Sequence, residues 1–335
     1  MTCYLGIDVA QASLSVAVAD GQQAAVYVGE FPNHPTGFEQ LVATVNSRWP
    51  AQPVQVVVEA TGGYEASLVE TAHALGWRVS VVNPWRVRQW AKGQGRRTKT
   101  DRQDALLLAR FAAATQPPAQ DPLPEEVADL AELERRKEDL QSLLGSEQNR
   151  LRQARQRPRT PPSVLRSLER TIQVLQEELR QVEQAIEQHL THQATLAQQR
   201  RLLLSVPGVG PKVASYLLVL LHRFCAYTAQ QGDKKALTAY VGLDPVQQES
   251  GRTVAKRPTI SKQGDKRART LLYLGALGGI RGNNPLRTFY QALVARGKAR
   301  KLALVAAARK LLTWAWAVFV QKTPFDPSRF AHAQT

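Results

Sequence analysis

Apolar and polar positions along the first 115 residues follow patterns that predict strands and helices in alternation. Strand patterns occur in CYLGIDVA, SLSVAVAD and AAVYVGEF, three segments close enough to be joined by short turns. A helical pattern runs from Gly37 to Ser47. The run VQVVVEA is then largely β-branched, as in a buried central strand. A helical segment from Tyr64 to Leu75 separates it from a last strand in WRVSVVNP.

This order of elements, β-β-β-α-β-α-β-α, opens with an antiparallel meander and closes with a helix that follows GRRTKT. It is the order of the ribonuclease H-like fold. Residues 1–115 are therefore predicted to form one α/β domain of this type. A chain of 335 residues has room for roughly two domains and a connector.

A proline-rich segment, TQPPAQDPLPEE, ends the alternating pattern and predicts a domain boundary. We expect a helical connector over residues 116–200, with RPRTPPS ending one helix and Ser163 capping the next. Apolar residues in the second helix recur at spacings of three and four, which is the seam of a coiled coil: Leu165, Leu168, Ile172, Leu175, Leu179, Val182 and Ile186. Such a seam fits a hairpin or pairing with a second copy of the chain, and we favour a spacer that also dimerises.

Residues 201–335 are predicted to form a mostly α-helical third domain. It begins with LLLSVPGVGPKVASYLL, a pattern typical of a helix-hairpin-helix element. In that element, Gly208 and Gly210 would let backbone N–H groups approach a phosphate, with Lys212 beside them. A tight interhelical turn explains the same pattern equally well. The apolar stretch LALVAAARKLLTWAWAVFV is interrupted by Arg309 and Lys310, which predicts a packed helix and no membrane span.

Charge points to the class of partner. The net charge is +16, with 22 Lys and Arg against 5 Asp and Glu in residues 201–335 and 22 against 23 in residues 1–200. A polyanion, meaning nucleic acid before an anionic membrane, is the expected partner, and the C-terminal part is the stronger docking surface. Cys3 and Cys225 support neither a disulfide framework nor a zinc site, which fits a reducing cytoplasm.

Two acids stand at strand ends. Asp8 ends the first strand, in YLGIDVA, and Glu59 ends the buried run VQVVVEA. An acid in such a place is costly unless it is partnered or binds a cation. Each alone could be a turn residue.

Two further acids fall in the stretch GRRTKTDRQDA. Thr100 and Gln103 form a capping box, so a helix should begin at Asp101, with Asp104 one turn further on the same face. Four carboxylates could converge on one or two Mg²⁺ or Mn²⁺ ions. Basic residues around the helix start would bring phosphates to the same place: Arg86, Arg88, Lys92, Arg96, Arg97, Lys99 and Arg102.

Taken together and in order, several motifs resemble those of the DEDD transposases of bacterial insertion sequences, the IS110 family. They are GIDVA, VVVEATGGYE, VVNPWRVRQWAKGQGRRTKTDRQDALLLA, LLSVPGVGP, AYVGLDPVQQESG and ISKQGDKRAR. The likeness covers most of the chain, and the spacing of the four acids matches.

The resemblance implies a RuvC-like N-terminal domain in which Asp8, Glu59, Asp101 and Asp104 bind Mg²⁺. It implies a C-terminal transposase domain whose nucleophilic serine corresponds to Ser250. DNA would be joined through a serine–DNA phosphodiester, with the two sites supplied by different protomers of a homodimer or homotetramer. A structured noncoding RNA, the bridge RNA, would guide the protein to donor and target DNA. The expected location is the bacterial cytoplasm.

From the residues alone, Ser250 is an ordinary turn residue, with no His beside it in sequence to act as a general base. Its activation would have to come from a metal or from another protomer. Basic residues crowd it and would stabilise an attacked phosphate: Arg252, Lys256, Arg257, Lys262, Lys266, Arg267 and Arg269. Aromatic residues near basic ones could stack on bases, although core packing is favoured for the last two: Tyr240, Trp85, Trp90, Trp314 and Trp316.

Three other functions compete with a transposase. A hydrolytic nuclease or junction resolvase would use the same four acids with water and would not need Ser250. An ATP-binding protein of the actin and sugar-kinase type would need more phosphate-binding loops than ATGG alone. A nucleic-acid scaffold would use only the basic C-terminal part. An RNA-guided, Mg²⁺-dependent recombinase is the function we expect.

Overall fold

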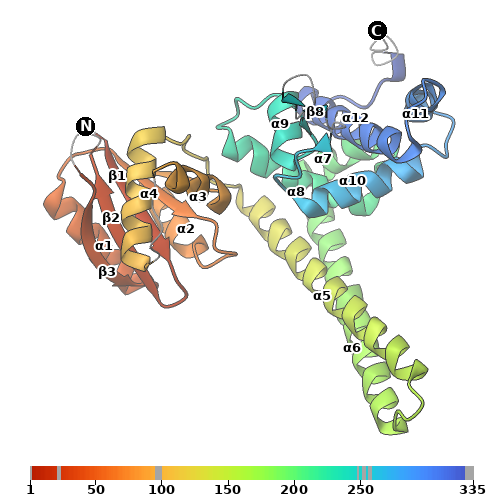
Figure 1. The fold of residues 1–335 in the computed structure, drawn as a ribbon, viewed down its shortest axis with the longest axis horizontal. Coiled ribbons are helices and arrows are strands. Elements are labelled where there is room, and N and C mark those ends of the chain that lie inside the picture. The colour runs from red at the N-terminus through yellow and green to blue at the C-terminus, as the bar shows by residue number, and fades with distance from the viewer. Residues whose placement is uncertain are drawn as a thin grey trace. The chain divides into compact units, whose positions relative to one another are not determined.

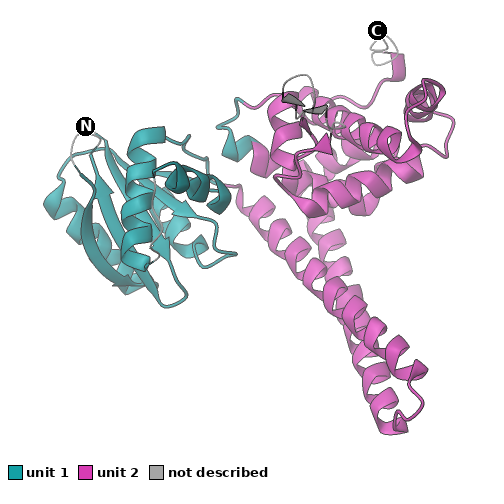
Figure 2. Cartoon of the chain, in the orientation of Figure 1, with its two compact units in different colours: residues 1–122, 225–231 teal, residues 123–224, 232–335 magenta. Residues whose placement is uncertain are grey.

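The computed structural model describes residues 2–20, 24–94, 100–246, 249–250, 254–255 and 259–328; for residues 249–250 and 254–255 it describes the backbone only. Two compact units are present (Figure 2). The first comprises Met1–Pro122 and Cys225–Gln231, and the second comprises Leu123–Phe224 and Gly232–Thr335. Several predicted nucleic-acid-binding residues lie outside the described residues: Arg96, Arg97, Lys99, Arg252, Lys256 and Arg257.

The first unit is built on a five-stranded sheet with the order β3-β2-β1-β4-β5 (Figure 1). β1, β2 and β3 form an antiparallel meander, whereas β4 runs parallel to both β1 and β5. The predicted α/β arrangement of this region is confirmed. The bounds are β1 (Cys3–Val9), β2 (Ser13–Ala19), β3 (Val26–Pro32), β4 (Val54–Glu59) and β5 (Arg78–Val82).

One face of the sheet is covered by α1 (Pro35–Arg48) and α2 (Ala66–Ala74). Alternate residues of the central strands point to this side and form a fully buried core with Leu41 and Leu68 of the two helices. Leu5 and Ile7 of β1 belong to this core. The residues that alternate with them, Tyr4, Gly6 and Asp8, therefore face the opposite side of the sheet.

The opposite face carries α3 (Pro84–Gly93) and α4 (Asp101–Thr115). The sequence pattern predicted only the second of these helices. A Cβ at Gly6 would lie 2.1 Å from the backbone nitrogen of Ala109, so α4 packs directly on β1 at a point where only glycine fits. Ala17 and Ala19 of β2 continue this small-residue surface.

Helix α4 begins where the capping box predicts. The Thr100 hydroxyl accepts a hydrogen bond from the Gln103 backbone N–H at 3.3 Å, and the first helical residue is Asp101. The proline-rich segment then follows the sheet edge. The Gln55 side chain donates to the Pro117 carbonyl at 2.7 Å, and the Gln120 backbone N–H donates to Val79 at 2.7 Å.

The second unit starts with a long helical hairpin, α5 (Glu125–Gln156) and α6 (Pro162–His192), which pack against each other (Figure 1). The predicted cap at Ser163 is wrong. Helix α6 begins at Pro162, one residue before Ser163. Its N-cap residue is Pro161, and no side chain forms a capping hydrogen bond there. Proline suits the first helical position because its φ is already helical and its missing N–H would have no partner there.

The six described helices that follow the hairpin share one apolar core with the ends of α5 and α6. Among the described helices, only α12 is long and apolar enough to cross a membrane, and half of that stretch is buried inside this core. Trp314 of α12 is 2% exposed, as expected for a packed helix. The bounds are α7 (Ala194–Leu204), α8 (Pro211–Tyr227), α9 (Lys234–Val241), α10 (Lys266–Gly279), α11 (Pro285–Ala295) and α12 (Arg300–Gln321).

Between α9 and α10 the chain forms two short antiparallel ladders. β6 (Pro245–Val246) pairs with β9 (Thr259–Ile260), and β7 (Glu249–Ser250) pairs with β8 (Val254–Ala255). We call residues 245–260 the serine hairpin.

Candidate active site and nucleic-acid interface

The strand register brings the two strand-end acids together along the backbone. Ile7 of β1 pairs with Val58 of β4 in a parallel ladder, so the next residues, Asp8 and Glu59, lie beside each other at the carboxyl ends of these strands. Both are half-buried. Paired residues of neighbouring strands share a face, and for this pair it is the face covered by α4.

The two helix acids lie on the same face of the sheet. Helix α4 contacts Gly6 through Ala105 and Ala109. Asp104 directly precedes Ala105 and is half-buried, and Asp101 is exposed one turn earlier. Since Asp8 lies only two residues after Gly6, the strand acids and the helix that carries Asp101 and Asp104 share this face of the sheet near Gly6. We call this region the acid edge.

Side chains at the acid edge do not form a closed metal site. Within the described parts of the chain, no three His, Cys, Asp or Glu side chains are placed to hold a metal ion. The donor chemistry of four carboxylates nevertheless suits a hard divalent cation. The metal site therefore stays a prediction, supported by the backbone positions and the donor type.

A fifth carboxylate fixes the loop that follows Glu59. The Glu65 carboxylate accepts hydrogen bonds from the Thr61 hydroxyl at 2.5 Å, the Thr61 N–H at 3.2 Å and the Gly63 N–H at 2.9 Å. Partial burial opposes ionisation of Glu65, but these hydrogen bonds outweigh it and lower its pKa. Sequence reasoning missed this residue, although Thr-Gly-Gly followed by an acid is a signal for such a loop.

Exposed cations and aromatic rings follow the neighbouring strand ends. Arg86, Arg88 and Lys92 of α3 are all exposed, as a role in binding phosphate requires. Trp85 at the start of α3 is 50% exposed, and Tyr64, which follows β4, is 51% exposed.

The other candidate stacking residues are packed. Trp90 meets Phe111 edge-on with 5.8 Å between ring centroids, and Trp316 packs against Phe224 at 5.3 Å. Tyr240 also contacts Phe224. Among the aromatic residues considered from the sequence, Trp85 is thus the one presented to solvent.

The second unit holds the predicted nucleophile. The Ser250 backbone lies in β7 opposite Val254. Of the described cations near it in sequence, Arg267 reaches Gln141 of α5, whereas Lys262, Lys266 and Arg269 line a cavity of about 320 Å³ at the base of the serine hairpin.

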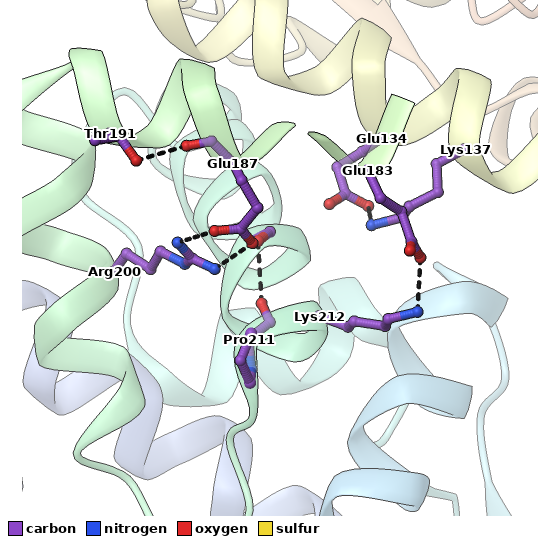
Figure 3. Close-up of polar contacts among 9 residues, drawn as sticks. Glu134, Lys137, Glu183, Glu187, Thr191, Arg200, Pro211 and Lys212 are labelled. Carbon is purple, nitrogen blue, oxygen red and sulfur yellow. Dashed lines mark hydrogen bonds and ion pairs between the residues drawn. The ribbon is translucent and has the colours of Figure 1, made fainter. Parts of the chain in front are cut away.

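The glycine-rich turn between α7 and α8 is packed against the protein. A Cβ at Gly208 would lie 2.7 Å from the Gly275 carbonyl oxygen, and Gly208 has a left-handed φ of 94°. Gly210 is exposed. The Lys212 ammonium pairs with Glu183 of α6 at 2.6 Å (Figure 3). Packing accounts for Gly208, and phosphate binding by this turn stays a prediction.

A buried charge pair lies close to the Lys212–Glu183 ion pair (Figure 3). Glu134 and Lys137 of α5 form an ion pair in which both side chains are at most 5% exposed (Figure 3). Burial raises the pKa of Glu134, and Lys137 opposes this effect. The pair is therefore a buried feature of this helix, and the positive charge of Arg267 also acts on Glu134.

Comparisons with known proteins match two regions of the chain to transposase families. Residues 5–157 match a family model described as a transposase, that of the DEDD transposases of IS110 elements. Residues 200–291 match the transposase IS116/IS110/IS902 family. The chain is 30% identical over 328 residues to the pilin gene-inverting protein of Moraxella bovis, which covers 96% of this chain and 97% of that protein.

Other relatives point the same way. The pilin gene-inverting protein of Moraxella lacunata is 29% identical over 325 residues, again covering 96% and 97% of the two chains. An uncharacterized 42 kDa protein of the insertion element IS900 from Mycobacterium paratuberculosis is 33% identical over 135 residues, or 38% of this chain and 31% of that one. The protein is thus an enzyme that acts on DNA, of the recombinase and transposase class. It belongs to the IS116/IS110/IS902 family of transposases, which confirms the resemblance seen in the sequence.

Proposed function

We propose that this chain is the recombinase of an insertion element and that it cuts and rejoins DNA through a covalent serine–DNA linkage. Residues 1–115 are a RuvC-like catalytic domain, residues 116–200 a connector and residues 201–335 a transposase domain. The observation that supports the proposal is the acid edge, where the strand register pairs Asp8 with Glu59 on the face of the sheet that α4 covers.

The acid edge is proposed to hold Mg²⁺ or Mn²⁺ through Asp8, Glu59, Asp101 and Asp104. When bound, such an ion supplies Lewis-acid stabilisation of the charge on an attacked phosphate. The chain's own contribution is to hold the donors in place. The strand register holds Asp8 beside Glu59, and the close contact of Gly6 with Ala105 and Ala109 holds α4 against the same strand.

Ser250 is the proposed nucleophile. Its Oγ would attack a DNA phosphorus, so that one phosphate–sugar bond breaks, a serine–DNA phosphodiester forms and one hydroxyl end is released. The serine proton passes to an acceptor group. Attack on this linkage by the hydroxyl end of another strand rejoins the DNA and restores the serine. Lys262 and Lys266, exposed in the same unit, would offset the phosphate charge.

A guide RNA and a second protomer complete the proposal. The family resemblance supports a structured noncoding RNA that pairs with donor and target DNA, so that base pairing reads sequence while the protein holds the backbone. The excess of positive charge in residues 201–335 supports binding of such polyanions. Different protomers of a homodimer or homotetramer would supply the acid edge and Ser250.

The test is a search for DNA covalently attached to protein on a denaturing gel. Protein co-expressed with the element-end RNA is mixed with donor DNA, target DNA and Mg²⁺, and wild type is compared with Ser250→Ala and Asp101→Asn. We expect an adduct in wild type and its near-complete loss in both variants, with DNA binding largely retained. The matched controls are Ser146→Ala and Asp129→Asn, exposed residues of α5 far from both sites in sequence, which should form the adduct normally.

A hydrolytic nuclease is the alternative. It predicts cut DNA without an adduct and unchanged cutting by Ser250→Ala, and that result would overturn the serine assignment.

Inversion is a second candidate outcome of strand exchange, because the two relatives that span the chain are named pilin gene-inverting proteins. A plasmid with two sites in inverted orientation distinguishes it from excision, since inversion alone preserves the length of the plasmid.

A further inference from the structure

The cavity at the base of the serine hairpin has a construction that suits one kind of ligand. We propose that it binds a single unpaired nucleotide, with the base inside and the phosphate at the rim. This inference rests on the proposed function, because it assigns a role within the same nucleic-acid-binding unit. We call the cavity the nucleotide pocket, and its principal residues are Leu243, Ile260, Lys262, Lys266, Arg269 and Tyr273.

One wall of the nucleotide pocket is a single face of α10. Lys266, Arg269, Thr270 and Tyr273 all line it and stand at positions i, i+3, i+4 and i+7, so their side chains project from the same side of the helix. Charge lies toward the start of the helix, and the half-buried Tyr273 ring lies two turns further along. A ligand along this wall thus meets cations at one end and an aromatic ring at the other.

Apolar side chains from three other segments complete the lining. Leu243 and Ala308 are buried, and Ile260 of β9 and Val305 of α12 are half-buried beside them. A planar apolar group fits such a lining, and a nucleobase is the planar group that carries a phosphate at a fixed distance. Base stacking on aromatic side chains is a common basis of binding to unpaired strands.

The cations of the rim are held in place by the backbone around α9. Arg269 donates from one guanidinium nitrogen to the Val241 carbonyl at 2.9 Å, and a guanidinium has further N–H donors available for a phosphate. Lys262 has a left-handed φ of 57°, and its N–H donates to the Gly242 carbonyl at 3.2 Å. Its exposed ammonium and that of Lys266 add two more positive charges.

The nucleotide pocket lies near the proposed nucleophile along the chain. Ile260 of its lining pairs with Pro245, at the base of the serine hairpin. Ser250 is five residues from Pro245, which limits the separation of their α-carbons to about 18 Å. An unpaired nucleotide held here would lie within a few nucleotides of the phosphate that Ser250 attacks.

The size of the nucleotide pocket favours an unpaired base. A volume of about 320 Å³ is at the lower end of the range for small-molecule sites and does not admit a stacked duplex. Proteins that act on nucleic acid accept such a base after it leaves the stack.

The experiment measures binding of a short duplex with one bulged 2-aminopurine, made in a DNA form and an RNA form, against the same duplex fully paired. Full-length wild type, Tyr273→Leu, Tyr273→Phe and Tyr290→Leu are compared by fluorescence anisotropy and by quenching of 2-aminopurine. Tyr290 is a half-buried tyrosine of α11 that does not line the cavity, so its variant controls for loss of a tyrosine.

Wild type should bind the bulged duplex more tightly and quench its fluorescence. Tyr273→Leu should weaken that binding by about tenfold, leave the paired duplex unchanged and remove the quenching, while Tyr273→Phe and Tyr290→Leu keep both. A loss in the DNA arm assigns the pocket to a DNA strand, and a loss in the RNA arm to the guide.

Equal binding of both duplexes by Tyr273→Leu and wild type would overturn the inference. If the serine adduct still forms in that case, the proposed function stands without the nucleotide pocket. Failure of wild type to bind either duplex at low salt would instead count against the proposed function itself.

Discussion

Single residues at two helix starts and at one close contact show which local signals the sequence carries. The start of α4 was predicted from Thr100 and Gln103, because a capping box acts within four residues of chain. The cap at Ser163 was not, because the preceding proline competes for the start of the helix. The role of Gly6 depends on a helix about a hundred residues later, and no local pattern announces such a contact.

Glu65 gives a pH-dependent prediction. Its folded-state pKa is lowered, so its contribution to stability is present above the unfolded-state pKa and is lost as pH falls through the folded-state value. Glu65→Gln should therefore reduce the free energy of unfolding by about 1 kcal/mol at neutral pH, and the difference from wild type should vanish in acid. Denaturant titrations of both proteins at neutral pH and near pH 3 measure this.

The exposed Glu70 of α2 provides the matched control for Glu65. Glu70→Gln should differ little from wild type at either pH. A Glu65→Gln deficit that stays constant, or grows, as the pH falls would contradict the predicted role of the carboxylate.

At the scale of elements, the pattern predicted the long helices but not their pairing. The seam in residues 165–186 fits a hairpin or a dimer, and the structure shows that α5 and α6 pack against each other. The seam stays partly open: Leu165, Ile172 and Leu179 remain half-buried, and Val174 of α6 is 56% exposed. Helix periodicity predicts which face of each helix is apolar. Which partner covers that face depends on the loop between α5 and α6.

We therefore expect two hairpins to associate through these faces. Leu143→Lys combined with Val174→Lys places charge on two exposed apolar positions, one on each helix, and should shift a dimer toward monomer in light scattering coupled to size exclusion. The control Gln173→Lys adds charge at an exposed polar position of α6 and should leave the mass unchanged. An unchanged mass for the double variant would exclude this surface as the interface.

At the scale of the whole molecule, the proposed chemistry is divided between two compact units. The four acids belong to the first unit, and Ser250 belongs to the second. The sequence motifs predicted that the acids precede the serine in separate regions, because each motif is contiguous in sequence. The short ladders of the serine hairpin were not foreseen, since two-residue strands are too brief to produce a periodic signal.

If different protomers supply the two sites, two inactive chains should help each other. Asp101→Asn and Ser250→Ala proteins, each inactive alone, should regain part of the wild-type adduct when co-expressed, because some sites then receive an intact acid edge and an intact serine. The amount of adduct on a denaturing gel is the measurement. Co-expression of Ser250→Ala with Asp101→Asn/Ser250→Ala should give no adduct, and absence of recovery in the first mixture would place both sites in one protomer.

The packing of Pro117 and Pro118 against β4 and β5 marks where this division falls. The carbonyl groups of Pro117 and Pro118 accept hydrogen bonds from buried Gln55 and Ser80, so the chain stays with the first unit until Pro122. In genetic terms, inactivating mutations in the acid edge and in the serine hairpin should define two complementation groups. The boundary between the two groups should lie close to Pro122. A defective copy of the element would then help a partner copy mutated in the other group. It would inhibit an intact copy by forming mixed assemblies with it.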